Sequence, residues 1–234
     1  MRISRSGAAL TIHLITAGTL VACSAGEPTV TLQSESDPVT LDVSPPELVF
    51  GSLGQSRQLE VVVKDASGRR LAGVPVGFSS DHSGVATVSP AGLVTAVGNG
   101  DAQIAVRGGP LMALVPVRVR QIPAVLAKFG GDGQESTPAA RLLLPLSVRV
   151  TDSLGVPVAG AAVSFAVAPG GGVVDPDRAL TSPDGTASTA WTVGSAAGVQ
   201  LVTARIDAIA LPAVVFRATV RPDVPAQMSR TSPD

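Results

Sequence analysis

Three segments of the chain alternate apolar and polar side chains with a period of two residues. In 146–151, Leu, Val and Val alternate with Ser, Arg and Thr, and segments 162–167 and 214–220 follow the same pattern. Such alternation places apolar groups on one face of a β-strand and polar groups on the other. Beyond the first 22 residues, no stretch sustains the three-to-four spacing of an amphipathic helix. The pattern therefore predicts an almost entirely β mature protein.

An internal repeat divides the chain. Leu59–Phe78 and Leu146–Phe165 share nine identities in twenty ungapped positions at a constant offset of 87 residues. The identities include Asp65/Asp152 and Gly68/Gly155, in a corner where glycine supplies a positive φ. A unit of 87 to about 100 residues is the size of one immunoglobulin-like sandwich. We predict two tandem immunoglobulin-like β-sandwiches, over residues 39–120 and 121–221.

The first 22 residues read as an export signal, with Arg2 and Arg5 before an uncharged, mostly apolar run. The run ends in Leu20-Val21-Ala22-Cys23, which resembles a bacterial lipobox. That resemblance implies cleavage before Cys23 and lipid attachment to its thiol, so that the membrane is the first expected partner. The alternative is ordinary signal cleavage after Ala25, because small residues also precede that bond.

Lipidation would leave a mature chain that begins at Cys23 and continues as a polar tether to residue 38. Serine, and not aspartate, follows Cys23, which in similar lipoproteins of two-membrane bacteria implies passage to the outer membrane. Cys23 is the chain's one cysteine, so no disulfide can form within the chain, and the sandwiches depend on packing alone.

Composition narrows the function classes. The chain has 17 Lys and Arg against 18 Asp and Glu, a formal net charge of −1. This balance argues against a nucleic-acid partner, which requires a basic surface. Gly (25) and Pro (19) are frequent but fall short of a disordered composition, so a folded protein rich in turns fits best.

Few residues offer chemistry. After export His82 is the one imidazole, and its polar SSDHSG segment predicts a solvated loop residue and no catalytic role. Asp175, Asp177 and Asp184 are candidates for a hard cation, but their Pro-Asp and Asp-Gly contexts favour turns. The 170–172 glycine run lacks the Lys-Ser/Thr and helix of a phosphate site and predicts a loop. We expect no catalytic, metal or cofactor site.

Two further positions are open to a functional interpretation. Trp191 lies on a Thr/Ala strand, where it packs either in the core or between domains, or else forms an exposed platform for sugar stacking. Arg69-Arg70 in the first repeat's corner predicts a solvated turn tip.

The second unit carries LSVRVTDSLGVPVAGAAVSFAV and SPDGTASTAWTVGSAAGVQLVTARI. Over 123–221 it resembles the bacterial Ig-like group 1 domains of the invasin and intimin type. The first unit carries SSDHSGVATVSPAGLVTAVGNGDAQIAV and over 39–120 resembles the group 2 variety, except that Gly77-Phe78 stands where a Trp is common. The resemblance implies non-catalytic, cell-surface immunoglobulin-like modules.

Three functions remain open. The first is a cell-surface lipoprotein whose sandwiches act as a spacer or structural interaction module, supported by the short Gln121-Ile122-Pro123 join. The second is an adhesin for a host, matrix or envelope glycan or protein. The third is a fragment of a larger repeat protein that carries a polysaccharide-acting enzyme. It would explain residues 222–234, which read as a flexible tail or as the start of a third repeat, since Val224-Pro225-Ala226 echoes Ile122-Pro123-Ala124.

Overall fold

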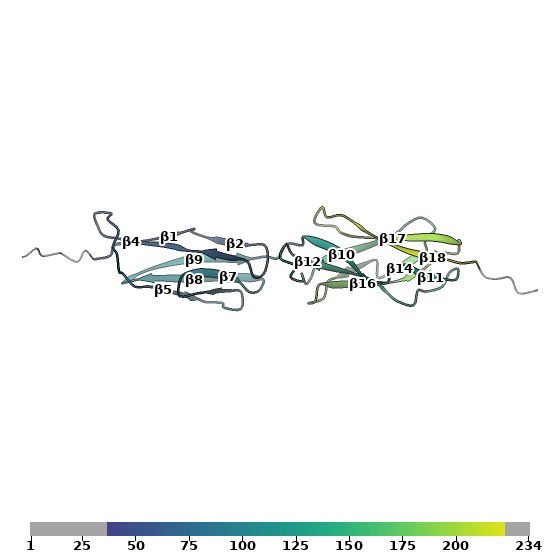
Figure 1. Cartoon of the computed structure of the whole chain (residues 1–234), viewed down its shortest axis with the longest axis horizontal. Helices are drawn as coiled ribbons and strands as arrows, with labels where there is room; N and C mark the ends of the chain where they lie inside the picture. The colour runs from purple at the N-terminus through teal and green to yellow at the C-terminus, as the bar shows by residue number, and fades with distance from the viewer. Residues whose placement is uncertain (1–36, 223–234) are drawn as a thin grey trace, which may run out of the picture. The chain divides into compact units, whose positions relative to one another are not determined.

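The computed structural model describes residues 37–222, in which all regular secondary structure is β-strand. Eighteen strands are present in this part of the chain, nine in each of two successive groups (Figure 1). The predicted all-β fold is therefore confirmed.

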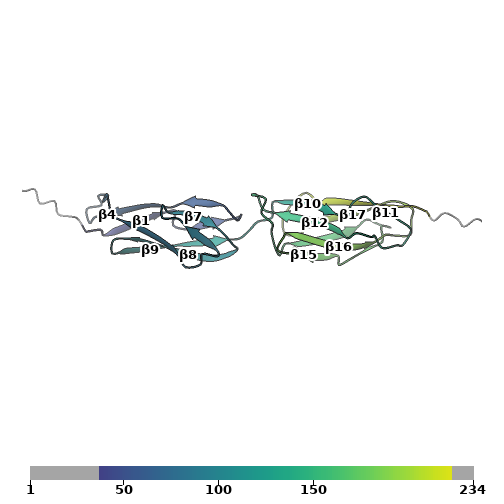
Figure 2. The same ribbon diagram turned by 60° about the horizontal axis from the view of Figure 1, so that its bottom comes forward.

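The first sandwich contains β1 (Thr40–Ser44), β2 (Leu48–Phe50), β3 (Ser56–Gln58), β4 (Glu60–Lys64), β5 (Val76–Ser80), β6 (Ala86–Val88), β7 (Leu93–Ala96), β8 (Gly100–Gly108) and β9 (Leu111–Val119). One layer has the order β2-β9-β8-β5, and the other consists of β1-β4 and β3-β7-β6. Figure 2 shows β1, β4 and β7 in one layer and β8 and β9 in the other.

The second sandwich contains β10 (Val125–Gly130), β11 (Gln134–Ser136), β12 (Leu146–Thr151), β13 (Ala162–Val167), β14 (Val173–Asp175), β15 (Arg178–Leu180), β16 (Thr186–Thr192), β17 (Gly198–Ile206) and β18 (Val214–Val220). Its layers are β10-β12-β16-β14 and β11-β18-β17-β13-β15. β15 lengthens the second layer by one edge strand, pairing with β13.

Both sandwiches divide their N-terminal segment between the two layers. β1 pairs antiparallel with β4, whereas β2 runs parallel to the last strand, β9. In the second sandwich β10 pairs antiparallel with β12 and β11 runs parallel to β18. This two-layer arrangement is that of immunoglobulin-like sandwiches, so the chain contains two of them in tandem.

Each sandwich encloses its own apolar core, built by the predicted alternation. Leu146, Val148 and Val150 are each 0% exposed, while the intervening residues of β12 are only partly buried. Phe216, Ala218 and Val220 of β18 point into the same core, and Phe50 and Ile104 belong to the core of the first sandwich. At about 25 cal/mol per Å² of apolar surface removed from water, such cores supply the main stabilisation of a fold without disulfides.

Trp191 is fully buried in the core of the second sandwich. Its indole Nε1–H donates to the carbonyl of Gly171 over 2.7 Å, which satisfies the one polar group of the buried ring. Gly172, at φ +86°, passes so close to β16 that a Cβ there would lie 2.1 Å from the Thr192 carbonyl oxygen. The glycine run is therefore a loop that closes the core, as predicted. The sugar-stacking interpretation of Trp191 is wrong, because no ring surface reaches solvent.

We expect Trp191→Ala to lower the free energy of unfolding by about 3–5 kcal/mol, since it leaves a cavity and an unpaired Gly171 carbonyl. Urea denaturation followed by circular dichroism measures this. Phe129→Ala, at a side chain that is 59% exposed, is the matched control and should cost far less. Equal losses in the two variants would contradict this assignment of the core.

Candidate functional site

The first sandwich carries a shallow hollow of about 300 Å³ beside β8 and β9, lined in part by Asp81, His82, Asp101 and Arg118. His82 Nδ1 lies 3.1 Å from Asp81 Oδ1, and both side chains are exposed. The backbone N–H of Gln103 donates to Asp81 and holds the pKa of that carboxyl below its usual range. No hydroxyl or thiol is found among the lining residues for His82 to activate. His82 is thus a solvated loop residue, as predicted.

The acidic candidates of the second sandwich lie in turns. Asp184 Oδ1 accepts hydrogen bonds from Ser182 Oγ and, over 2.9 Å, from Thr186 Oγ1, and these bonds lower its pKa. Asp175 and Asp177 are both exposed, at the end of β14 and in the loop after it. Between residues 37 and 222, no three His, Cys, Asp or Glu side chains gather as they would to hold a metal ion.

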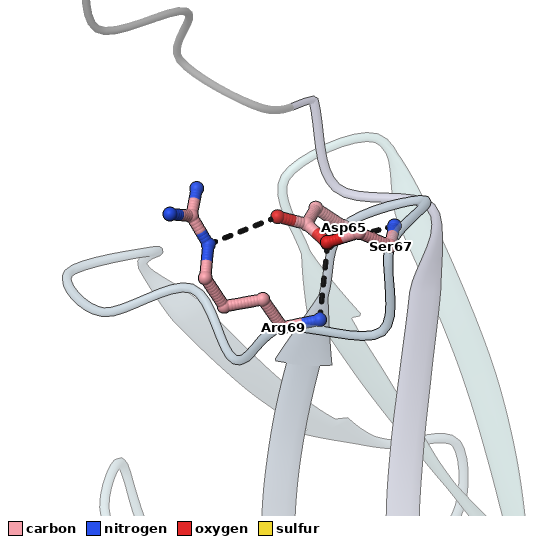
Figure 3. A network of polar contacts seen from close by, with 3 residues as sticks. All are labelled: Asp65, Ser67 and Arg69. Atoms are coloured by element: carbon pink, nitrogen blue, oxygen red, sulfur yellow. Dashed lines mark hydrogen bonds and ion pairs between the residues drawn. The ribbon is translucent and has the colours of Figure 1, made fainter.

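The corner that follows β4 is built on the buried carboxylate of Asp65 (Figure 3). Its Oδ1 accepts the backbone N–H groups of Ser67 (2.9 Å) and Arg69 (3.0 Å). Its Oδ2 lies 3.2 Å from the Nε of Arg69. Gly68, at φ +82°, completes the turn. Arg69 and Arg70 are exposed as predicted, but Arg69 also folds back onto Asp65, a contact that the local sequence does not indicate.

The corner that follows β12 repeats this arrangement 87 residues later. Asp152 Oδ1 accepts the N–H groups of Leu154 and Val156, each over 3.0 Å, and Gly155 has φ +79°. The backbone bonds across the corner are also equivalent: Gly155 donates to the Asp152 carbonyl over 3.0 Å, as Gly68 does to that of Asp65 over 2.9 Å. The repeat in the sequence thus corresponds to the same hydrogen-bonded turn in both sandwiches.

The two corners differ in what binds the second carboxylate oxygen. Oδ2 of Asp152 accepts the backbone N–H of Leu53 over 3.1 Å and the carboxamide Nε2 of Gln121 over 3.0 Å. Leu53 follows β2 in the first sandwich, and Gln121 follows β9 in the join. Both sandwiches belong to one compact unit of the chain, and these bonds connect them.

Gln121 is the centre of this joint. Its Nε2 also donates to the Pro157 carbonyl over 3.2 Å, and its Oε1 accepts from Asn99 Nδ2 over 3.1 Å. Beside it, the hydroxyls of Ser52 and Ser153 lie 2.8 Å apart. A single glutamine side chain is therefore held by both sandwiches.

Hydrogen bonding decides the ionisation of Asp152. Burial by itself raises the pKa of a carboxyl, but here the Gln121 carboxamide and the N–H groups of Val156, Leu154 and Leu53 all favour the charged form. The bonds outweigh burial and hold the pKa of Asp152 below its usual value. The carboxylate therefore stays an acceptor at neutral pH.

Because this pKa is depressed in the folded state, its contribution to stability is present above the unfolded-state value, about 3.9, and is lost as pH falls through the folded-state value. We expect the free energy of unfolding to decline below about pH 4 and Asp152→Asn to make that decline shallower. Urea denaturation between pH 2.5 and 7 measures it. Asp177→Asn, at an exposed loop carboxylate, is the control. An unchanged slope in Asp152→Asn would contradict the assignment.

Several predictions concern residues outside those described: the signal over 1–22, Cys23, nearly all of the tether, and the segment that follows residue 222. In the part of the chain that is described, no helix long and apolar enough to cross a membrane is found.

No protein-family model matches the chain, and no curated protein matches it. Among solved structures, the chain is similar to the Yersinia pseudotuberculosis adhesin InvE, with 15% identity, a TM-score of 0.40 and coverage of 77% of this chain and 58% of that one. The Escherichia coli adhesin FdeC has 22% identity and a TM-score of 0.37, with coverage of 77% of this chain and 63% of that one. Domains 5–6 of the S-layer protein SbsC have 21% identity and a TM-score of 0.33, with coverage of 79% of this chain and 99% of that one. The chain thus spans less than two thirds of either adhesin structure, and no function follows from likenesses this distant.

Proposed function

We propose that this chain is a non-catalytic, lipid-anchored bacterial surface protein of the outer membrane whose two sandwiches act as a spacer or structural interaction module. The observation that carries the proposal is Cys23, the chain's one thiol, placed directly after Leu20-Val21-Ala22. The sequence motifs of 39–120 and 123–221, which resemble those of group 2 and group 1 bacterial Ig-like domains, support such a role, although no family model matches the chain.

The hydrogen bonds that join the two sandwiches support the spacer role. A spacer must transmit position from one domain to the next, and a join without cross-domain bonds would behave as a flexible linker. Here Leu53 and Gln121 both donate to Asp152.

The anchor is tested by Cys23→Ala in the full chain. We expect fatty-acid incorporation to be lost and the protein to move from the detergent phase to the aqueous phase, because two or more acyl chains provide durable attachment and no other anchor is proposed. Ser24→Ala is the matched control, since it leaves the thiol in place. An N-terminal peptide without acyl chains on Cys23 in the unaltered protein, measured by mass spectrometry, would refute the anchor.

An adhesin is the second candidate, and Phe129 favours it. Of the aromatic side chains that the structure describes, only this one is largely exposed, at 59%. The guanidinium of Arg149 lies 5.7 Å from the centre of its ring. Aromatic and arginine side chains are the residues that most often dominate binding surfaces. Phe129 on β10, and not Trp191, is therefore the candidate for an exposed aromatic binding platform.

A glycan and extracellular-matrix array separates the two functions. A spacer predicts no saturable binding to any component. An adhesin that uses Phe129 predicts binding that falls at least tenfold in Phe129→Ala and is unchanged in Leu180→Ala, a control at another exposed apolar side chain. Saturable binding that Phe129→Ala lowers at least tenfold would contradict the spacer proposal and support the adhesin.

A further inference from the structure

We infer that the corner carboxylate of each sandwich is a socket for the end of a preceding sandwich, occupied at Asp152 by Leu53 and Gln121 and closed at Asp65 by Arg69. This inference concerns the joint alone and stands whether or not the chain is anchored by lipid.

The two carboxylate oxygens have separate tasks. In both corners Oδ1 accepts two backbone N–H groups from within the same turn, at 2.9–3.0 Å, and this suffices to fold the turn. Oδ2 takes no part in the turn's backbone bonds. The donors that reach it differ between the sandwiches: Arg69 at Asp65, and Leu53 and Gln121 at Asp152.

In the second sandwich, the donors to Asp152 Oδ2 come from the first sandwich and from the join that follows it. Asp152 is 1% exposed in the intact chain, so water does not compete with these donors while the sandwiches are joined. A buried, ionised acceptor without hydrogen bonds is strongly unfavourable. Both donors to Oδ2 are distant in sequence, 99 and 31 residues away. Separating the sandwiches would replace the bonds from the Leu53 N–H and the Gln121 carboxamide to Asp152 Oδ2 with bonds to water. Because hydrogen bonds to a charged acceptor shielded from water are stronger than those to water, the two bonds hold the joint closed.

In the first sandwich the equivalent oxygen is bound by the corner's own side chain. Arg69 occupies the position that Val156 holds in the second corner, and its Nε lies 3.2 Å from Asp65 Oδ2. A valine side chain has no donor, so the second corner leaves Oδ2 to a partner. The partner that fits is a loop N–H with a carboxamide beside it, which is what the end of the first sandwich presents through Leu53 and Gln121.

Distance measurements between the sandwiches test the inference in the full chain. With Cys23→Ala in place, spin labels are attached to cysteines introduced at the exposed positions Thr87 and Thr219, and electron–electron dipolar spectroscopy gives the distance distribution. We expect a single narrow distribution in the parent chain and one at least twice as wide in Asp152→Asn. Asparagine retains an Oδ1 for the turn but replaces the second acceptor with a donor.

Asp65→Asn is the matched control, because it makes the same change in a corner that lies outside the joint between the two sandwiches, and its distribution should equal the parent's. Val156→Arg should broaden the distribution, since it supplies the second corner with the equivalent of Arg69. Gln121→Leu removes one donor without altering the corner, and should broaden the distribution even if Asp152→Asn unfolds.

An unchanged width in both Asp152→Asn and Gln121→Leu would overturn the socket. Equal broadening in Asp65→Asn and Asp152→Asn would also overturn it, because the effect would then be general loosening of the sandwiches. A parent-like width in Val156→Arg would refute the closing role of Arg69.

Discussion

The arrangement of this protein depends on one buried carboxylate at the end of the strand that leads into each corner. Removed from water, the carboxylates of Asp65 and Asp152 must each be surrounded by donors, and the tight turn that follows supplies two backbone N–H groups to one oxygen. That demand explains why the corner has the same geometry in both sandwiches. The second oxygen, Oδ2, binds a different donor in each sandwich: Arg69 in the first, and Leu53 and Gln121 in the second.

The sandwiches themselves need no such device, because apolar packing stabilises them. Without a second cysteine, the link between their layers is the contact of alternating valines and alanines, completed in the second sandwich by the indole of Trp191. The Gly171 carbonyl accepts the indole N–H, so the glycine loop becomes part of the core.

Periodicity and the repeat predict most of the fold, because alternation along a strand directly reports which face is buried: Leu146, Val148 and Val150 are all core residues. The turn roles of Asp184 and Gly155 also follow from local chemistry. The joint does not, because the bond from Leu53 to Asp152 spans 99 residues and no periodic signal marks it. Trp191 was ambiguous for a similar reason, since a strand pattern gives the face of a side chain but not the loop that covers it. The short Gln121-Ile122-Pro123 join was the local hint of a spacer, and the meaning of the difference between Arg69 and Val156 emerges only when the bonds to Asp152 are seen.

The backbone amide of Leu53 offers the most direct test, because its N–H reports on the bond to Asp152 without any substitution. Hydrogen exchange resolved by nuclear magnetic resonance measures its protection in the intact chain. If the carboxylate joins the sandwiches, this amide exchanges at least a hundredfold more slowly than an unstructured peptide of the same sequence. Exchange at the unstructured rate, with the core amides of β12 still protected, would contradict the account.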